Sequence, residues 1–326
     1  YGVVDHFHPK WQVWDQFLLG QTTPAMGRDG LNDTCAIEIP GGEHVVINTS
    51  TAPIIYSKGS SILRVVQGYI GNDNLRKGLQ NYLKTFEYDN AASHNLWEAL
   101  EETSGKPVTA LMKSWIEQPG HPLVQAQRIG RDLMLTQKRF TYLENTSDQT
   151  WQIPVSITVY YETGDSKTIS ILLEEVSTRF DLGAACKAYK VNAGQTGFYR
   201  VAYQAPEDLA AIGQLITGKE ISSEDRWGLQ NDVFAQVQCG RISIDDYLAF
   251  LNNYLDEDAY LPLSSMSDNL FQAQLVSDGS CKEKIRSFGR SMHEKTLSTI
   301  GYFPEPDEIL TNSLLRDQIL WPAVVY

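Results

Sequence analysis

The segment Tyr56-Ser57-Lys58-Gly59 brings a phenol, a hydroxyl and an amine together with a glycine in four consecutive residues. A tyrosine hydroxyl donates a hydrogen bond, and a donor of this kind can stabilise the oxyanion of a tetrahedral intermediate. A glycine at position 59 would let the helix that begins here approach a neighbour closely. Taken alone, however, these four residues favour a tyrosine that only packs at the start of a helix.

Two other patterns resemble metal ligands but are incomplete. His6-Phe7-His8 is an H-x-H pair with no third or fourth ligand at a useful spacing. His293-Glu294 begins like the H-E-x-x-H motif of zinc peptidases, but residue 297 is Leu, so we predict an ordinary pair on a helix surface. The sequence also has no glycine-rich nucleotide loop and no G-x-S-x-G nucleophile elbow. We therefore expect no metal-binding and no cofactor-binding residue in this chain.

The 326 residues carry a formal net charge of −13 at pH 7. Because binding to phosphates needs a surplus of Lys and Arg, this charge argues against a nucleic-acid partner. The length suggests two or three domains, and no run approaches the roughly 18 apolar residues of a membrane-spanning helix. Both ends lie in apolar sequence without helix caps, so we expect a piece of a longer protein. Its oligomeric state stays open.

Four cysteines lie far apart, with no C-x-x-C pair among them: Cys35, Cys186, Cys239 and Cys281. This spacing fits neither a zinc knuckle nor a disulfide framework and is typical of a reducing compartment. We therefore expect a cytoplasmic protein. Three N-x-S/T sequons could accept glycans in a secreted protein, and the sequence leaves their use open: Asn32, Asn48 and Asn145.

The elements that would position these residues fall into three segments. From residue 1 to residue 122 the apolar residues follow a helical period. A first helix follows Pro9, a loop runs from Gly20 to Thr51, and a second helix has its apolar face between Ile62 and Ile70. Further helices follow, and Pro119-Gly120 ends the last of them.

Between residues 123 and 204 the period changes to two. Apolar and polar residues alternate from Ile153 to Tyr161 and again from Ile169 to Leu173, with a turn signal at Thr163-Gly164-Asp165. A final short strand is expected from Phe198 to Tyr203. Short strands separated by turns predict a small antiparallel β-sandwich.

From residue 205 to residue 326 the helical period returns, with short loops between helices as in an α-helical array. Ser243 and Asp246 resemble a capping box in which Asp replaces the usual Glu or Gln. We therefore predict a multidomain α+β protein with domains over residues 1–122, 123–204 and 205–326.

Several phrases stand in order along the chain: Ile55–Ser60, Trp115–Pro122, Trp151–Val155, Gly197–Val201 and Asp225–Asp232. Each is weak alone, but together they resemble the aminopeptidase N family of zinc metallopeptidases, which are of the gluzincin type. The chain is most similar to the family's microbial members of the tricorn-protease-interacting-factor type. The resemblance implies the helical rear part of a thermolysin-like catalytic domain, then a β-sandwich, then the first part of a C-terminal helical domain.

The family's activity, by resemblance, is the zinc-dependent removal of N-terminal residues from peptides. In these enzymes a glutamate of H-E-x-x-H activates a zinc-bound water, and the tyrosine that matches Tyr56 helps zinc to hold the oxyanion. Tyr56 is therefore the one catalytic residue that the resemblance assigns to this chain. Arg200, Asp225 and Arg226 also match family phrases, and we interpret them as structural anchors.

The sequence departs from the family pattern in lacking H-E-x-x-H, the glutamate that is the third zinc ligand, and G-x-M-E-N. We therefore expect zinc in the parent protein, no catalytic zinc in this chain and no hydrolysis by the chain alone. Two alternatives are a non-catalytic aminopeptidase-like interaction module and a related zinc epoxide hydrolase. Apolar faces at Trp11, Trp14 and Phe17 would give the isolated chain marginal solubility or a tendency to self-associate.

Overall fold

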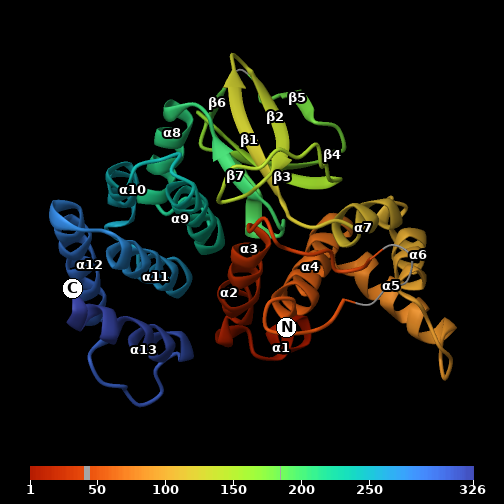
Figure 1. Ribbon diagram of the computed structural model, residues 1–326, viewed down its shortest axis with the longest axis horizontal. Coiled ribbons are helices and arrows are strands. Elements are labelled where there is room, and N and C mark those ends of the chain that lie inside the picture. The colour runs from red at the N-terminus through yellow and green to blue at the C-terminus, as the bar shows by residue number, and fades with distance from the viewer. Residues whose placement is uncertain (40–44, 184) are drawn as a thin grey trace. The chain divides into compact units, whose positions relative to one another are not determined.

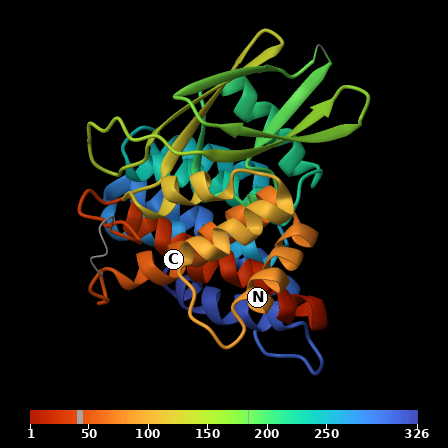
Figure 2. The ribbon, with the colours of Figure 1, turned by 90° about the vertical axis from the view of Figure 1, so that its right-hand side faces the viewer.

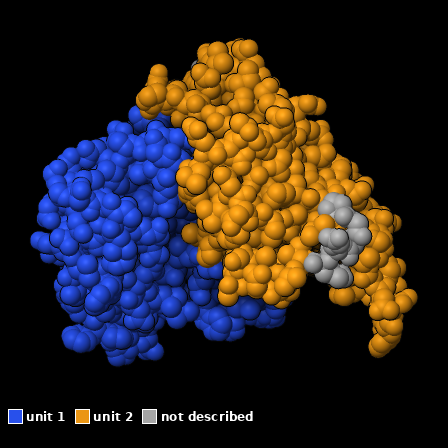
Figure 3. All heavy atoms as spheres, in the orientation of Figure 1, with its two compact units in different colours: residues 1–20, 209–326 blue, residues 21–208 orange. Residues whose placement is uncertain are grey.

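The computed structural model describes residues 1–39, 45–183 and 185–326, and in it helices precede and follow a group of strands (Figure 1). The chain divides into two compact units (Figure 3). Unit 1 consists of Tyr1–Gly20 and Leu209–Tyr326, and unit 2 of Gln21–Asp208. The predicted α+β class, with a helical, a β and a second helical region, is confirmed.

Unit 2 opens with helices that lie on one side of its strands (Figure 2). The π-helix η2 (Leu18–Thr22) leads into α3 (Thr23–Asp29), and further along the chain come the π-helix η3 (Pro53–Lys58), α4 (Gly59–Ile70), α5 (Asn72–Thr85), α6 (Ser93–Ser104) and α7 (Val108–Ile116). Helix α4 buries Ile62, Val65, Val66 and Ile70, which share one face at spacings of three and four residues. Gly71, with φ at +83°, ends it.

The strands of unit 2 form two sheets with the strand orders β5-β2-β1-β7 and β4-β3-β6. Their bounds are β1 (Pro122–Ile129), β2 (Asp132–Arg139), β3 (Ile153–Tyr161), β4 (Ser166–Leu173), β5 (Ser177–Asp181), β6 (Cys186–Val191) and β7 (Arg200–Tyr203), with a short 3-10 helix η4 (Ala193–Gln195) before β7. The alternating residues of β3 and β4 pair in antiparallel register around the predicted turn, where Gly164 has φ at +87°.

One feature of the sheets differs from the prediction of an antiparallel sandwich. Strand β7 runs parallel to β1, from the pair Leu123–Arg200 to the pair Ala126–Tyr203. The alternation of apolar residues cannot distinguish the two directions, because a strand buries the same face in either. The remaining pairings in both sheets are antiparallel.

The two sheets and the helices of unit 2 share one hydrophobic core. Leu135 of β2, Val155 of β3 and Val66 of α4 belong to it and are fully buried. Trp115 of α7 lies in the same core and donates a hydrogen bond from Nε1 to the carbonyl oxygen of Gln152 at 2.9 Å. The helices and the two sheets of unit 2 therefore pack around a single hydrophobic core.

Unit 1 is helical. Its elements are α1 (Gly2–Phe7), η1 (Pro9–Trp11), α2 (Val13–Phe17), α8 (Pro206–Thr217, which begins in unit 2), α9 (Ser223–Gln238), α10 (Ile244–Leu251), η5 (Asn252–Tyr254), α11 (Tyr260–Val276), α12 (Gly279–Ile300) and α13 (Leu310–Val325). The predicted cap of α10 is confirmed, because Ser243 Oγ accepts a hydrogen bond from the amide of Asp246 at 3.1 Å. Helix α9 is buried along almost its whole length.

A buried ion pair anchors α9 in unit 1. Arg226 donates from Nε and Nη2 to the two carboxylate oxygens of Glu257, at 2.6 and 2.8 Å, and from Nη1 to the carbonyl oxygen of Ile221. Tyr254 Oη donates to the carbonyl oxygen of Arg226 at 2.7 Å. Such a two-pronged contact fixes both position and direction, as the predicted anchoring role of Arg226 requires.

The predicted loop from Gly20 to Thr51 is wrong in its first part. Residues 18–29 are helical, and α3 buries Ala25, Met26 and Asp29. The many small and polar residues of this stretch favour a loop locally, but burial against the rest of unit 2 outweighs that weak preference. Residues 40–44 of the same stretch lie outside the described residues.

The first predicted helix is interrupted. Gln12 has φ at +47° and separates η1 from α2. The expected exposure of Phe17 is wrong, because the side chain is 2% exposed and packs edge-on against Tyr1 and Trp14. Trp11 is 46% exposed.

The structure also bears on membrane-spanning helices and on the cysteines. Within the described part of the chain, no helix is both long and apolar enough to cross a membrane. All four cysteines carry free thiols.

Candidate functional site

Tyr56 lies in the π-helix η3, and its side chain is 60% exposed. Two residues further along, Lys58 is completely buried. The same short turn therefore presents a phenol to solvent and an amine to the interior. Single π-helical turns are rare and often occur at functional sites.

Lys58 makes two polar contacts in the interior of unit 2. Its Nζ lies 3.0 Å from Oδ2 of Asp29 and donates a hydrogen bond to the carbonyl oxygen of Gly120 at 2.9 Å. Asp29 is the last residue of α3, and Gly120 precedes β1. The ammonium group thus ties η3 both to α3 and to the segment that leads into the sheets.

Asp29 is fully buried and has further donors around it. Its Oδ1 accepts hydrogen bonds from Thr34 Oγ1 at 2.8 Å and from the amide of Gly120 at 3.0 Å. Burial by itself raises the pKa of this carboxyl, but the positive charge of Lys58 more than offsets it. The pKa of Asp29 is therefore held well below its usual range, and the group is anionic at neutral pH.

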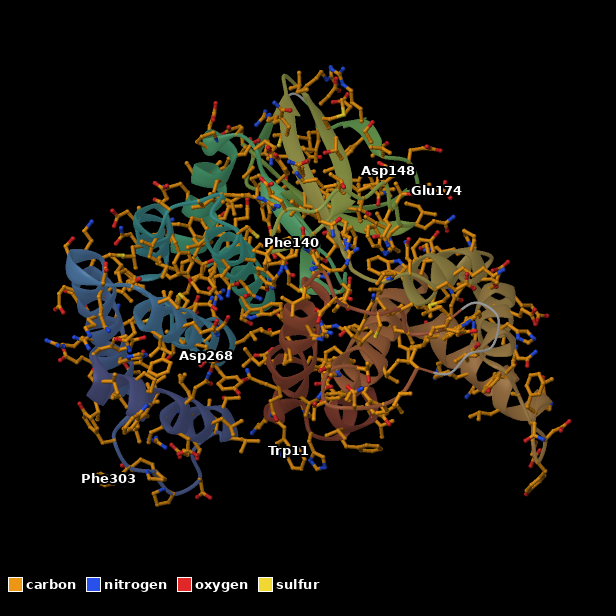
Figure 4. All side chains as sticks on the ribbon, viewed as in Figure 1. Trp11, Phe140, Asp148, Glu174, Asp268 and Phe303 are labelled. Carbon is orange, nitrogen blue, oxygen red and sulfur yellow. The ribbon has the colours of Figure 1, made fainter. Side chains whose placement is uncertain are left out.

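His121 completes the buried cluster. Its Nδ1 lies 3.6 Å from Asp29 Oδ2, which is longer than a hydrogen bond. Its ring stacks on Phe140, with centroids 5.2 Å apart, and packs edge-on against Phe198. Phe140, which directly follows β2, is labelled in Figure 4. Burial lowers the pKa of His121, so the ring is neutral at neutral pH. Asp29, Lys58 and His121 are hereafter the anchor cluster.

Ser57 connects η3 to η2, just before α3 begins. Its Oγ donates to Gln21 Oε1 at 2.8 Å, and its carbonyl oxygen accepts hydrogen bonds from the hydroxyls of Ser60 and Ser61. Ser61 in turn lies 3.2 Å from Thr22 Oγ1. Contacts just before α3 and at its end therefore hold the turn that carries Tyr56.

The close approach expected at Gly59 is absent. A Cβ atom there would meet no heavy atom within 4 Å, and the residue has an ordinary helical φ of −52°. Gly59 therefore leaves open space one turn away from Tyr56, and no close contact between helices depends on its missing side chain. A single sequence cannot distinguish these two uses of a glycine, because both need only a missing side chain.

The sequence predicts Tyr56 as a hydrogen-bond donor, and the structure shows that its side chain is exposed. The anchor cluster of Asp29, Lys58 and His121 is not predicted by the sequence. A signal for the burial of Lys58 was present, because it stands four residues after Ile54 and four before Ile62, both of which are fully buried. Nothing in the sequence indicates its pairing with Asp29.

The incomplete histidine motifs do not form a site. His8 stacks on Trp11 with ring centroids 4.3 Å apart, and His6 packs edge-on against Phe7. The prediction of a surface position for His293 is wrong, because its side chain is fully buried and its Nε2 lies 2.9 Å from Ser267 Oγ. A helix face is assigned from neighbouring residues, and α12 has polar residues on several sides.

A metal ion does not fit the residues present. Among residues 1–39, 45–183 and 185–326, no three His, Cys, Asp or Glu side chains gather as a ligand set. In the anchor cluster the carboxylate of Asp29 already faces the ammonium of Lys58, which a cation would have to displace. The chemistry available to the described part of the site is hydrogen-bond donation by the exposed hydroxyl of Tyr56.

The sequon asparagines lie in two places. Asn145 Nδ2 donates to Asn32 Oδ1 at 2.9 Å. Asn48 Oδ1 accepts from the amides of Ser50 and Thr51, at 2.8 and 3.1 Å, and so closes a local turn.

Comparison with known proteins gives two family matches. Residues 1–115 match the peptidase family M1 domain, and residues 188–326 match the ERAP1-like C-terminal domain. Tyr56 and two members of the anchor cluster, Asp29 and Lys58, lie within the first match. His121 lies between the two.

Named relatives match over most of this chain. A leucyl aminopeptidase of Saccharolobus solfataricus is 30% identical over 290 residues, which are 89% of this chain and 35% of the relative. Tricorn protease-interacting factor F2 of Thermoplasma volcanium is 34% identical over 86% of this chain and 34% of its own length. Aminopeptidase M1 of Arabidopsis thaliana is 30% identical over 100% of this chain and 39% of its own length. The chain thus spans between a third and two fifths of these relatives.

Proposed function

We propose that this chain is part of an enzyme of the aminopeptidase N family, which takes part in the zinc-dependent removal of N-terminal residues from peptides. Its matches to the peptidase family M1 domain and to the ERAP1-like C-terminal domain support this proposal. Relatives named aminopeptidases match over most of the chain, which supports the proposal. The observation that carries it is the exposed Tyr56 on a turn held from inside by the anchor cluster.

In this proposal Tyr56 is the catalytic residue of the chain. When a peptide carbonyl is attacked, negative charge develops on its oxygen, and the hydroxyl of Tyr56 donates a hydrogen bond to that oxygen. A donor that is already in place stabilises the transition state without reorganisation, which is why one such group contributes strongly to rate. The 60% exposure of Tyr56 leaves its hydroxyl accessible to a substrate.

Peptidases of family M1 are generally zinc-dependent. The described residues contain no set of metal ligands. We therefore propose that the zinc ligands lie outside these 326 residues of the parent protein. Under this proposal the chain alone does not hydrolyse peptides. Under the proposal, residues 1–122 belong to the catalytic domain, 123–204 to the β-sandwich domain and 205–326 to the C-terminal helical domain. We propose a cytoplasmic location from the four unpaired cysteines.

The test uses the complete gene product that contains this chain. It should hold stoichiometric zinc by elemental analysis and release the chromophore of an aminoacyl p-nitroanilide. Changing Tyr56→Phe should lower kcat by about 10² to 10³, as loss of an oxyanion donor does elsewhere, with KM nearly unchanged. Tyr88→Phe is the matched control, since Tyr88 lies in the same unit and is fully exposed.

Three results would count against the proposal in different ways. A complete protein without zinc and without turnover would favour a non-catalytic interaction module. Hydrolysis of an epoxide without cleavage of the anilide would replace the peptidase activity. Full activity of Tyr56→Phe would remove Tyr56 from the reaction while leaving the peptidase activity in place.

A further inference from the structure

We propose that Lys58, held by Asp29, is a positioning residue for Tyr56, so that the buried ion pair sets the direction of the exposed hydroxyl. This inference rests on the proposed role of Tyr56 in catalysis. The geometry behind it is the 3.0 Å contact between Lys58 Nζ and Asp29 Oδ2, two residues away from an outward-facing phenol.

Burial of the ion pair between Lys58 and Asp29 is costly in free energy. Moving a lysine and an aspartate out of water into a protein core is expensive, and packed apolar residues in their place would often be equally stable or more stable. Lys58 and Asp29 nevertheless have no exposed side-chain surface. A buried ion pair is therefore weak evidence for stability, and it is better explained by the single geometry that it enforces.

The buried ion pair fixes the position of η3. The Lys58 ammonium is bound by Asp29, at the end of α3, and by the carbonyl oxygen of Gly120. The neighbouring Ser57 is bound through Gln21, just before α3 begins. A π-helical turn closes each backbone hydrogen bond over one residue more than an α-helix does, and such turns are rare. The contact of Ser57 with Gln21, just before α3, and that of Lys58 with Asp29, at the end of α3, therefore hold η3 at two points.

The position of η3 in turn determines the direction of the Tyr56 hydroxyl. Tyr56 and Lys58 are on the same short turn but face opposite ways, so a rotation of η3 that releases the lysine also swings the phenol. A displacement of about 1 Å at a catalytic group can lower a rate about a hundredfold. The anchor cluster would thus act on the reaction only through Tyr56.

The first experiment places 3-fluorotyrosine at position 56 alone in the full 326-residue chain and records its 19F resonance. Lys58→Met and Asp29→Asn should each change the chemical shift of this resonance. Lys190→Met is the matched control, because Lys190 is 1% exposed in the same unit and its Nζ donates to the carbonyl oxygen of Val191 in β6. In Lys190→Met the 19F resonance of the fluorotyrosine at position 56 should have the same chemical shift as in the parent chain.

An unchanged resonance in Lys58→Met would overturn the inference, and so would an equal change in Lys190→Met. If circular dichroism shows that Lys58→Met does not fold, the double variant Asp29→Asn/Lys58→Met decides, because it leaves no unpaired buried charge. A shifted resonance in the folded double variant supports the inference, and an unshifted one refutes it.

The second experiment measures kinetics in the complete gene product. Lys58→Met should lower kcat by up to about a hundredfold with little change in KM, and it should lower kcat no further in a Tyr56→Phe background. An equal loss in both backgrounds would show that Lys58 acts independently of Tyr56 and would refute the inference. If the complete protein is no peptidase, the proposed function fails, while the 19F experiment still decides whether Lys58 positions Tyr56.

Discussion

His293 should make the stability of unit 1 depend on pH in a defined window. Its side chain is fully buried, its Nε2 lies 2.9 Å from Ser267 Oγ, and its ring stacks on Tyr326 with centroids 5.2 Å apart. Burial lowers the pKa of His293 to about 4. In the unfolded chain the same ring has a pKa of about 6.5.

The size and sign of the effect follow from these two values. Above about pH 7 the ring is neutral in both states, so His293 adds no pH dependence. Below pH 6.5 the unfolded chain binds a proton that the folded chain does not, and each pH unit lowers the free energy of unfolding by about 1.4 kcal/mol. The loss reaches about 2 kcal/mol at pH 5 and about 3 kcal/mol at pH 4.

The assay compares the parent chain with His293→Gln, which does not titrate. Urea unfolding is followed between pH 7.5 and pH 4.5 by hydrogen exchange of peptides from α11 and α12. The substitution removes the stacking on Tyr326 and should cost stability at pH 7.5, but this deficit should shrink by about 2 to 3 kcal/mol as the pH falls. His94→Gln, at an exposed position, is the control and should run parallel to the parent.

The reasoning is refuted if the stability difference between the parent and His293→Gln is the same at every pH. A proton titration of His293 observed by NMR near pH 6.5 in the folded chain would refute it independently.

Three further predictions concern unit 2 and the metal. Lys58→Met leaves the buried carboxylate of Asp29 unpaired and should cost about 3 to 5 kcal/mol in urea unfolding at pH 7; a loss below about 1 kcal/mol would contradict the contact at 3.0 Å. Gly59→Ala meets open space and should stabilise by up to about 1 kcal/mol. Gly78→Ala would place its Cβ 2.7 Å from Leu100 and should lower the free energy of unfolding by about 1 to 3 kcal/mol. Equal changes in urea unfolding for the two glycine variants would contradict the prediction that the free space at each glycine decides the sign. The 326-residue chain should retain no stoichiometric zinc after dialysis, and elemental analysis that finds one zinc per chain would contradict this.

The parts of the fold that could be predicted are those with a strong local signal. Strand β3 begins and ends where the alternation of Ile153 to Tyr161 does, because one face of the strand is buried from Ile153 to Val159. The cap at Ser243 could be predicted because capping depends on residues within one helical turn. The parallel pairing of β7 could not, since it depends on where the chain goes after η4 and not on the residues of the strand.

In the candidate site, too, residues with a local sequence signal could be predicted, and residues that depend on distant partners could not. Tyr56 was predicted from a four-residue phrase and its resemblance to a family, and its role remains a prediction. The burial of Lys58 could not be predicted from that phrase, because a lysine is almost always exposed unless it is paired. Its partner Asp29 stands 29 residues earlier, in a stretch whose composition favours a loop. His293 was misplaced for a related reason: its partner Ser267 is on another helix.

The parallel pairing of β1 with β7 has a consequence for the order in which the chain can fold. Strand β1 leaves the ribosome long before residues 200–203, so until then one edge of β1 has no partner for its backbone amides and carbonyls. Such an edge can pair with another chain. Once they are made, the four residues of β7 cover this edge of β1. We therefore expect a translation product that stops before Arg200 to expose a strand edge that the complete sheet keeps paired, and so to aggregate more readily.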